Sequence, residues 1–216
     1  MKKYVMCFIP AKKKSTGLKN KNLKKIKNKS LTEITVALAK KSRLFNKIVL
    51  SSDSRPILNI GNKYKIETHL RPKNISNNIA KTEEALTYSL EKINPKPEFI
   101  VILQVTSPLR KLDTLRKFVN FCIKKNFNTC LSVSKIDSQI SKYKKTFLPL
   151  TKIGARRRQD RQPYLYENSL FYFIKTKIFL KSKKIYSRKW NYFLTDKYEA
   201  IDINDKIDLN ICKKLY

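Results

Sequence analysis

The sequence predicts an α/β fold in which a mostly parallel sheet is covered by helices on both faces. Short apolar segments alternate along the chain with segments of helical periodicity, which is the pattern of strand–helix units. The apolar segments are continuous runs, such as FIVILQ at residues 99–104, as is typical of strands buried on both faces. The chain has 216 residues, of which 41% are hydrophobic, so we expect a single domain over residues 1–216 with a real core.

The first part of the chain predicts four strands, each followed by a polar loop. Apolar runs of this length, bounded by polar residues, favour buried strands. Ser30 and Glu33 have the spacing of a capping box, Thr82 is a candidate cap, and Pro95 ends a helix. The predicted strands are residues 4–9, 47–51, 66–70 and 99–104. One predicted helix begins at residue 31, and three more cover residues 56–64, 82–93 and 112–125.

The second part of the chain is less regular. Strands are predicted at residues 128–133, 170–174 and 200–203, and Asn204 or Asp205 is expected to cap a terminal helix. Between them, a polar stretch without a core face occupies about 135–167. Because long irregular segments within compact domains usually serve a function, we interpret this stretch as an excursion that binds a partner or a ligand.

The polar loops that follow the first four strands are expected to meet. The carboxyl ends of parallel strands lie at one edge of a sheet, and ligands bind there. The loops in question are residues 11–22, 51–54, 71 onward and 104–110. The sequence therefore predicts one binding site built from these loops.

The net charge is +33, from 49 Lys and Arg against 16 Asp and Glu. Lysine is spread over every segment rather than gathered on one, so biased composition explains the charge better than a dedicated nucleic-acid surface. We expect nucleic acid to bind only non-specifically, and the positive field to attract anionic substrates.

Composition also predicts the compartment. No apolar run has the length of a membrane span, and no cleavable signal peptide is recognised. The four cysteines are far apart and without metal-site spacing, so they are expected to be buried free thiols of a reducing compartment. These observations predict a cytoplasmic protein that is not in a membrane.

Four short segments carry candidate chemistry. Residues 10–22 combine small residues with lysines after the first strand, which suits phosphate binding, although a solvated loop is an equal alternative and no Walker or dinucleotide motif is present. Gln104 to Ser107 places an amide and two hydroxyls at the edge of the sheet, or forms an ordinary turn.

The other two segments lie later in the chain. Arg157 to Asp160 suits the binding of a carboxylate or polyhydroxylated ligand, or forms a salt-bridged surface. Asp202 and Asn204, two apart on a strand end, suit Mg²⁺, or merely precede the last helix.

The order of these segments is more specific than any one of them. The loop IPAKKKSTGLKNKN is followed by SSDS, LRP, LQVTSPLR, RRQD and IDIN. This succession, over about residues 4–210, resembles the CMP-sialic acid synthetase family, the acylneuraminate cytidylyltransferases or CMP-nonulosonic acid synthetases. The TSPLR segment together with the loop that ends in Lys-Asn is specific to that family.

The resemblance implies a fold and a reaction. The fold is a Rossmann-like nucleotide-diphospho-sugar transferase domain with a dimerisation arm at about 135–167, so a homodimer is expected. The reaction transfers CMP from CTP to the anomeric hydroxyl of a sialic acid-type nonulosonic acid, with Mg²⁺ or Mn²⁺, and releases pyrophosphate. The product is the activated sugar used in surface glycan synthesis. The sequence does not choose among sialic, legionaminic, pseudaminic and related acids.

The resemblance also implies roles for individual residues. Lys21, Lys12 and Asp202 are the implied catalytic residues. The implied nucleotide site consists of Ala11, Lys12, Ser15, Gly17, Lys21, Asn22, Arg71, Ala80 and Thr82. The implied sugar site consists of Gln104, Arg158, Gln159 and Tyr172, with the two arm residues reaching into a partner's site. The implied metal ligands are Asp202 and Asn204. His69 is interpreted as structural.

Besides Thr82, which replaces a serine, the chain departs from the family pattern at four positions that bear on activity. Lys12 replaces an arginine, Thr16 a lysine, Ser169 a glycine and Asn204 an aspartate. We predict an active enzyme with altered metal affinity. A weakened homologue that binds nucleotide or sugar without turnover is the alternative, and a basic nucleic-acid binder is a third.

Overall fold

The structure is a computed structural model, and it describes residues 3–14, 17–77, 79–142, 150, 157–186 and 189–216. A seven-stranded sheet runs through the molecule, and a small two-stranded ribbon lies beside it. The strands of the large sheet are β1 (Val5–Pro10), β4 (Lys47–Ser52), β5 (Glu67–Leu70), β6 (Phe99–Ile102), β7 (Thr129–Ile136), β8 (Tyr164–Lys175) and β9 (Asn191–Leu194). The ribbon consists of β2 (Lys25–Ile26) and β3 (Lys29–Ser30).

The sheet is mostly parallel, as predicted. Its strand order is β5-β4-β1-β6-β8-β7-β9. Strands β5, β4, β1 and β6 are mutually parallel, as are β7 and β9, whereas β8 is antiparallel to both of its neighbours. The chain leaves β1 towards β4 on one side and later returns to β6 on the other, so β1 and β6 flank a topological switch point. Ligand sites form at the carboxyl ends of strands at such a point.

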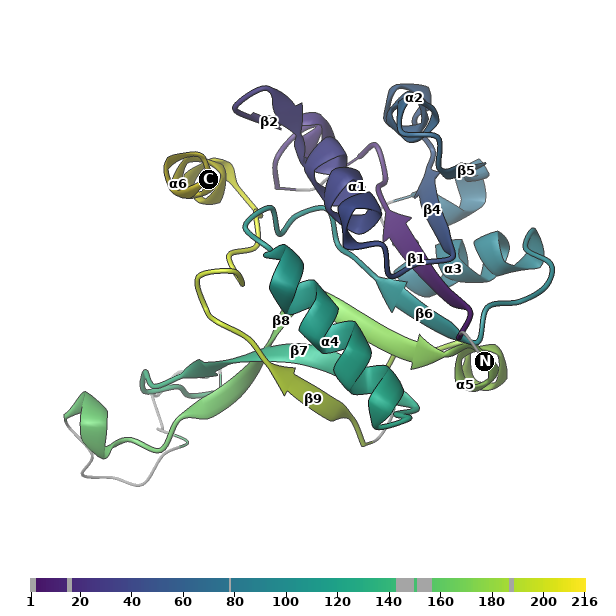
Figure 1. The fold of residues 1–216 in the computed structure, drawn as a ribbon. Helices are drawn as coiled ribbons and strands as arrows, with labels where there is room; N and C mark the ends of the chain where they lie inside the picture. The colour runs from purple at the N-terminus through teal and green to yellow at the C-terminus, as the bar shows by residue number, and fades with distance from the viewer. Residues whose placement is uncertain (1–2, 15–16, 78, 143–149, 151–156, 187–188) are drawn as a thin grey trace.

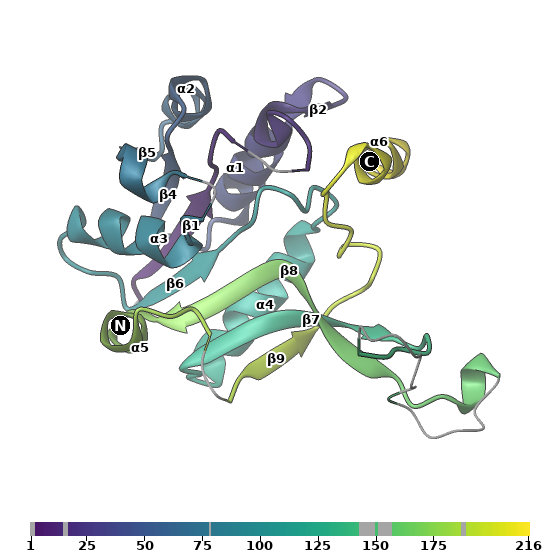
Figure 2. The same cartoon turned by 180° about the vertical axis from the view of Figure 1, so that it is seen from behind.

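Helices cover both faces of the sheet. In Figure 1, α1 and α4 lie in front of the sheet, and Figure 2 shows α3 and α5 on the opposite side. Two buried apolar clusters, one on each face, join the helices to the strands. The helices are α1 (Leu31–Ser42), α2 (Arg55–Lys63), α3 (Thr82–Glu91), α4 (Leu112–Lys124), α5 (Thr176–Ser182) and α6 (Lys206–Leu215), with short 3-10 turns at η1 (Lys21–Leu23), η2 (Lys73–Ile75) and η3 (Arg158–Asp160).

Local sequence signals explain several helix ends. Ser30 and Glu33 form the predicted capping box at α1, since Glu33 N donates to Ser30 Oγ at 3.2 Å and Ser30 N donates to Glu33 Oε2 at 2.8 Å. Asp205, rather than Asn204, caps α6 and accepts from the amides of Ile207 and Asp208. Such reciprocal bonds satisfy amides that a first helical turn leaves unpaired.

Other predictions were wrong in detail. Thr82 is the first residue of α3 and not its cap, because Lys81 precedes the helix and donates its amide to Glu84 at 2.8 Å. The predicted strand at 200–203 is irregular, and its Ile203 amide donates to Thr106 O at 2.9 Å instead of joining a ladder. Helix α5 and strand β9 were not predicted. Their lysines and tyrosines interrupt the apolar pattern around Phe179 and Phe193, which pack into the core.

The predicted irregular stretch is shorter than expected. Strand β7 extends to Ile136 and β8 begins at Tyr164, so part of the stretch is paired strand. The turn η3 and the adjoining start of β8 project from the body of the molecule at the lower left of Figure 1. Its role as a dimerisation arm stays a prediction.

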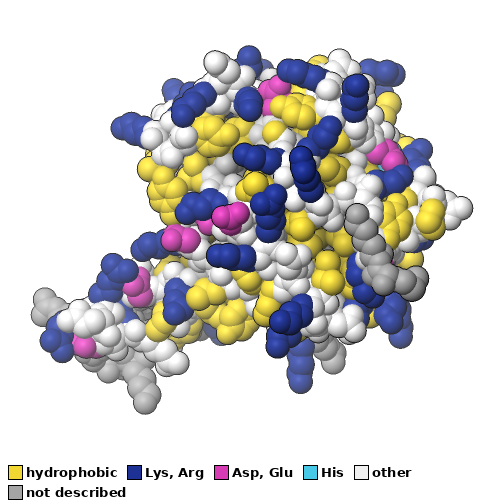
Figure 3. Space-filling model, in the orientation of Figure 1, with side chains coloured by type: hydrophobic (Ala, Val, Ile, Leu, Met, Phe, Trp, Pro, Cys, Tyr) yellow, Lys and Arg dark blue, Asp and Glu magenta, His cyan; other side chains and the backbone are white. Residues whose placement is uncertain are grey.

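On the face that Figure 3 draws, the basic side chains are distributed rather than clustered. Lys and Arg side chains lie over all parts of that face, with a few acidic groups between them. The four cysteines are free and buried, as predicted. Among the described residues, none of the helices combines the length and the apolar character needed to cross a bilayer.

Candidate active site

A pocket of about 300 Å³ opens at the carboxyl ends of the parallel strands. It lies at the switch point between β1 and β6, where the sequence placed a binding site. Its walls come from the loops after β1, β5 and β6, the start of α3, the middle of β8 and the segment before α6. The lining residues are Pro10, Lys12, Lys21, Asn22, Arg71, Ala80, Lys81, Thr82, Gln104, Val105, Thr106, Ser169 and Asp202.

The loop after β1 is fixed at both ends. At its start, the Ala11 amide donates to Ser51 O at 2.9 Å. At its end, Asn22 Nδ2 donates to Lys12 O at 2.8 Å, and the Asn22 carbonyl accepts from Thr32 Oγ1 at 2.8 Å. The loop is therefore closed by its own asparagine and tied to α1, which holds Lys12 and Lys21 on one wall.

Lys21 faces the segment that precedes α6. Its Nζ donates to Ile203 O at 2.6 Å. Burial lowers the pKa of Lys21, and the neighbouring Asp202 and Asp208 oppose that shift. The segment before α6 carries Asp202 and is called the acidic segment below. The Lys21 ammonium group thus lies half-buried between the loop and this acidic segment, where it can neutralise phosphate charge.

Gly17 packs directly on the same segment. A Cβ added at Gly17 would lie 2.3 Å from Asn204 O, far inside van der Waals contact. Glycine is required here by the close approach of two backbones. Loop and acidic segment are therefore in contact at two points, Lys21 and Gly17.

Arg71 lines the pocket from the loop after β5. It is 7% exposed, and burial lowers its pKa to about 10. Its Nε donates to Ser51 Oγ at 2.9 Å and its Nη2 to Ser51 O at 2.8 Å. A buried guanidinium that lines a pocket presents its remaining N–H groups as donors and offers no acceptor.

The loop after β6 supplies Gln104 and is held by a buried cation. Arg110 Nη2 donates to Gln104 O at 2.6 Å, and its guanidinium lies 5.5 Å from the centre of the Phe171 ring. Burial lowers the pKa of Arg110 to about 10. Ala80 and Thr82, which the resemblance assigns to the nucleotide site, line the pocket at the start of α3.

Asp202 and Asn204 were the predicted metal ligands. Asp202 lines the pocket, and its Oδ1 is buried without a hydrogen-bond partner among the described groups. Asn204 Nδ2 donates to Asp202 Oδ2 at 3.1 Å, so the amide nitrogen, not the oxygen, faces the carboxylate. In the described part of the chain no three His, Cys, Asp or Glu side chains form a metal cluster. Mg²⁺ needs only one or two protein carboxylates beside substrate phosphates, so Asp202 fits it.

Three of the predicted sugar-site residues do not line this pocket. Tyr172 lies in β8 with its hydroxyl bonded to Glu167 and, at 3.3 Å, to Ser169 Oγ, and its burial raises its pKa. Arg158 and Gln159 lie exposed on η3, where Arg158 Nε is bonded to Asp137. Within one chain, the structure therefore separates the arm from the pocket. Ser15, predicted for the nucleotide site, lies outside the described residues.

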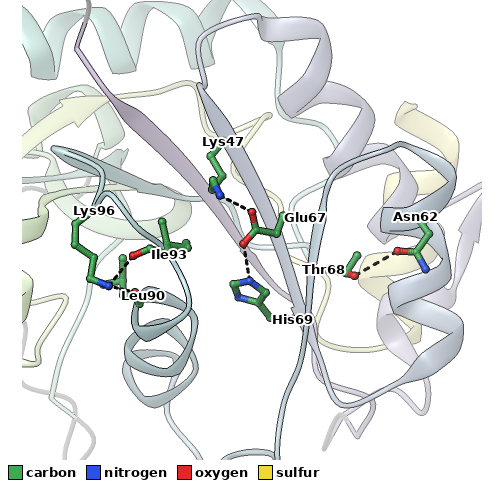
Figure 4. Close-up of polar contacts among 8 residues, drawn as sticks. All are labelled: Lys47, Asn62, Glu67, Thr68, His69, Leu90, Ile93 and Lys96. Carbon is green, nitrogen blue, oxygen red and sulfur yellow. Dashed lines mark hydrogen bonds and ion pairs between the residues drawn. The ribbon is translucent and has the colours of Figure 1, made fainter.

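His69 has a structural environment. Its Nε2 lies 2.7 Å from Glu67 Oε1, and Lys47 Nζ donates to Glu67 Oε2 at 2.5 Å (Figure 4). The imidazole is buried in β5, and burial lowers its pKa. This agrees with its interpretation as a structural residue.

Some lining residues were missed by sequence reasoning. Lys81 precedes α3, and Ser169 lies in β8 at an irregularity of the β7–β8 pairing, with φ of 59°. Thr106 carries one of the two hydroxyls that the predicted turn was expected to place at the edge of the sheet, and it lines the pocket. The left-handed conformation of Ser169 favours glycine, which is the residue that the resemblance places there.

The comparisons agree with this geometry. A family model described as Cytidylyltransferase matches residues 6–212. The chain belongs to the cytidylyltransferase family. It is accordingly a nucleotidyltransferase, and the resemblance recognised in the sequence motifs is confirmed.

Individual relatives of this cytidylyltransferase carry several names. The post-translational flagellin modification protein B of Campylobacter coli is 28% identical, over 98% of this chain and 94% of that protein. The CMP-N,N'-diacetyllegionaminic acid synthase of Legionella pneumophila is 26% identical, over 98% and 95%. The N-acylneuraminate cytidylyltransferase of Streptococcus agalactiae is 27% identical, over 94% of this chain but 51% of that protein, so the chain spans about half its length.

Solved structures show the same fold. A CMP:2-keto-3-deoxy-manno-octonic acid synthetase complexed with CTP superposes with a TM-score of 0.72 at 10% identity, over 98% of each chain. At this identity the likeness concerns the fold alone. The cytidylyltransferase described here thus places its pocket in a fold that a CTP-bound protein shares.

Proposed function

We propose that this cytidylyltransferase transfers CMP from CTP to the anomeric hydroxyl of a sialic acid-type nonulosonic acid and releases pyrophosphate. The observation that carries the proposal is that two lysines of one loop, Lys12 and Lys21, and the buried Arg71 line the same pocket. A nucleoside triphosphate has the matching polarity, with anionic phosphates at one end and a hydrogen-bonding base at the other.

The base end is assigned to Arg71, Ala80 and Thr82. A guanidinium donates only, and cytosine presents acceptors at O2 and N3, so the two are complementary. The small side chain of Ala80 leaves room beside the ring.

The phosphate end is assigned to the loop of Lys12, Gly17, Lys21 and Asn22, with Ser15 as a further prediction. The acceptor hydroxyl attacks the α-phosphorus, a new P–O bond forms, and the bond to the β-phosphate oxygen breaks as the hydroxyl loses its proton. Positioning and charge neutralisation carry most of the catalysis in such transfers. Lys21 stabilises the charge that develops on the leaving pyrophosphate.

The metal site is assigned to Asp202. A Mg²⁺ or Mn²⁺ ion bound there would neutralise phosphate charge when present. Asn204 adds an oxygen ligand only if its amide turns, because its nitrogen now faces Asp202.

The acceptor is assigned to the side of Gln104 and Ser169. Its carboxylate requires hydrogen-bond donors, which the Arg158 guanidinium and the Gln159 amide of a second copy would supply if the protein is a homodimer. The relatives' names include enzymes of sialic and legionaminic acid, so the acid within this class is left open. The product would serve surface glycan synthesis, and the free buried thiols favour a cytoplasmic enzyme.

A catalytically weakened homologue is the second candidate. It is favoured by the amide at Asn204, which faces Asp202 with its nitrogen, and by Thr16, which lies outside the described residues.

The deciding experiment is pyrophosphate release from CTP with Mg²⁺ and a panel of nonulosonic acids, repeated with ATP, GTP and UTP. Release with CTP and one acid is the expected result. Binding of CTP by calorimetry without release with any acid would support the weakened homologue instead.

A further inference from the structure

Ser51 holds the guanidinium of Arg71 through two bonds. Arg71 Nε donates to Ser51 Oγ at 2.9 Å, and Nη2 donates to the Ser51 carbonyl at 2.8 Å. Ser51 is fully buried near the end of β4. Both contacts therefore lie away from solvent, where each hydrogen bond has more effect on geometry than it would in water.

The same carbonyl also holds the start of the phosphate-side loop. The Ala11 amide donates to Ser51 O at 2.9 Å. One backbone oxygen thus accepts from the start of the loop that carries Lys12 and from the side chain of Arg71. A shift of Ser51 would therefore move both the start of this loop and the guanidinium of Arg71.

The two bonds leave Arg71 with a restricted set of free donors. A guanidinium has five N–H groups, and Ser51 takes one on Nε and one on Nη2. Arg71 lines the pocket, so the remaining N–H groups are the ones available to a base there. Without the Ser51 hydroxyl, Nε would lose its acceptor and the planar group could rotate about its last bonds.

We propose that Ser51 is a positioning residue that orients Arg71 and thereby sets the selectivity of the pocket for cytosine over uracil. The proposal rests on the proposed function of the pocket. Cytosine offers acceptors at O2 and N3, whereas uracil carries a hydrogen at N3. A fixed guanidinium distinguishes the two bases because a donor facing a donor is unfavourable, and a rotating guanidinium can avoid that conflict.

The test uses Ser51→Ala and a matched control, Ser52→Ala. Both serines are buried in β4, but they face opposite sides of the sheet, and Ser52 Oγ accepts from the Ser54 amide rather than from Arg71. We expect Ser51→Ala to weaken CTP binding about tenfold, the usual effect of losing one bond to a charged group, and UTP binding much less. Ser52→Ala should leave the ratio of the CTP and UTP dissociation constants at its wild-type value. Ser51→Thr, which keeps a hydroxyl, should also show the wild-type ratio.

A spectroscopic readout separates this proposal from the function itself. The Nε–H signal of Arg71 in the ¹⁵N spectrum should shift and exchange faster with water in Ser51→Ala but not in Ser52→Ala. An unchanged signal, or an equal loss of selectivity in both variants, would overturn the proposal. If the wild-type protein showed no preference for CTP, the proposed function would fail and the selectivity role with it, while the Arg71 signal would still decide whether Ser51 orients it.

Kinetics provide a further check. Because the base lies away from the reacting phosphorus, Ser51→Ala should raise KM for CTP with little change in kcat. A fall in kcat alone would contradict the assignment of Ser51 to the base.

Discussion

The Nζ of Lys21 donates to the backbone carbonyl of Ile203 at 2.6 Å, which joins two segments 182 residues apart in the sequence. The first segment is the loop after β1, and the second leads into α6. This bond places the ammonium group beside Asp202, on the wall of the pocket. Part of the site is therefore assembled by a contact between segments far apart in the sequence.

Replacing Lys21 by methionine should reduce turnover by roughly 10²-fold or more, because it removes the charge that stabilises the leaving pyrophosphate. The matched control is Lys19→Met, which removes an exposed lysine from the same loop. Steady-state pyrophosphate release measures both. Equal losses in the two variants would show that general positive charge, not Lys21, matters.

Replacing Gly17 by alanine should separate the loop from the acidic segment. The new Cβ would lie 2.3 Å from Asn204 O, so one backbone must move. We expect activity to fall at least about tenfold, with a melting temperature close to that of the wild type because the loop is exposed.

The control for Gly17 is Gly61→Ala in α2. There the added Cβ would lie 2.4 Å from Thr68 Cγ2, inside the packing of α2 on β5. This variant should lose stability, by about 1–3 kcal/mol, while the folded protein keeps its turnover. A reversed result, with Gly17→Ala unstable and fully active, would contradict the assigned contact.

Stability should fall as the pH drops below neutrality because of His69. Its pKa in the folded protein is lowered from 6.5, mainly by burial, despite the nearby Glu67; Lys92 and Lys47 lower it further. The unfolded chain therefore takes up a proton first, so this stabilising contribution is present above pH 6.5 and is lost as the pH falls through the folded pKa.

The measurement is urea unfolding between pH 7.5 and 5.0. His69 is the only histidine in the sequence, so His69→Gln should flatten the pH dependence in that range. Glu67, whose pKa is lowered from 4.5, contributes only at lower pH. An unchanged slope in the variant would exclude His69 as the cause.

The metal prediction concerns Asp202 and Asn204. Asn204→Asp should tighten Mn²⁺ binding about tenfold by adding a carboxylate, and Asp202→Asn should weaken it by a similar factor, since ligand charge sets the affinity for hard cations. Calorimetry and electron paramagnetic resonance with Mn²⁺ measure this without turnover. No change in either variant would move the metal site away from these residues.

The dimer prediction can be tested by complementation. If Arg158 completes the pocket of a second copy, Lys21→Met and Arg158→Ala subunits are each inactive alone. Mixed after subunit exchange, they form heterodimers with one intact site and regain partial activity. Light scattering that shows only monomers, or no recovery on mixing, would contradict the assignment of Arg158 to a neighbour.

Some of the site followed from the sequence alone. The alternation of apolar runs and helical segments predicted a mostly parallel sheet, and the carboxyl ends of parallel strands necessarily share one edge. We therefore expected five polar residues at one pocket. All five line it, namely Lys12, Lys21, Asn22, Arg71 and Gln104. The capping signals at Ser30 and Asp205 were likewise local, since they depend on residues three positions apart.

The tertiary structure decided which predicted residues reach the pocket. Asp202 arrives there on an irregular segment, because the Ile203 amide pairs with Thr106 O rather than with a strand. The irregular β7–β8 pairing brings Ser169 to the pocket, while Tyr172, three residues later, packs against Glu167. Arg158 lies in η3, and it is absent from the lining of its own chain's pocket. These placements depend on contacts between residues far apart in sequence, whose geometry is set by the packed core and not by local residue preferences.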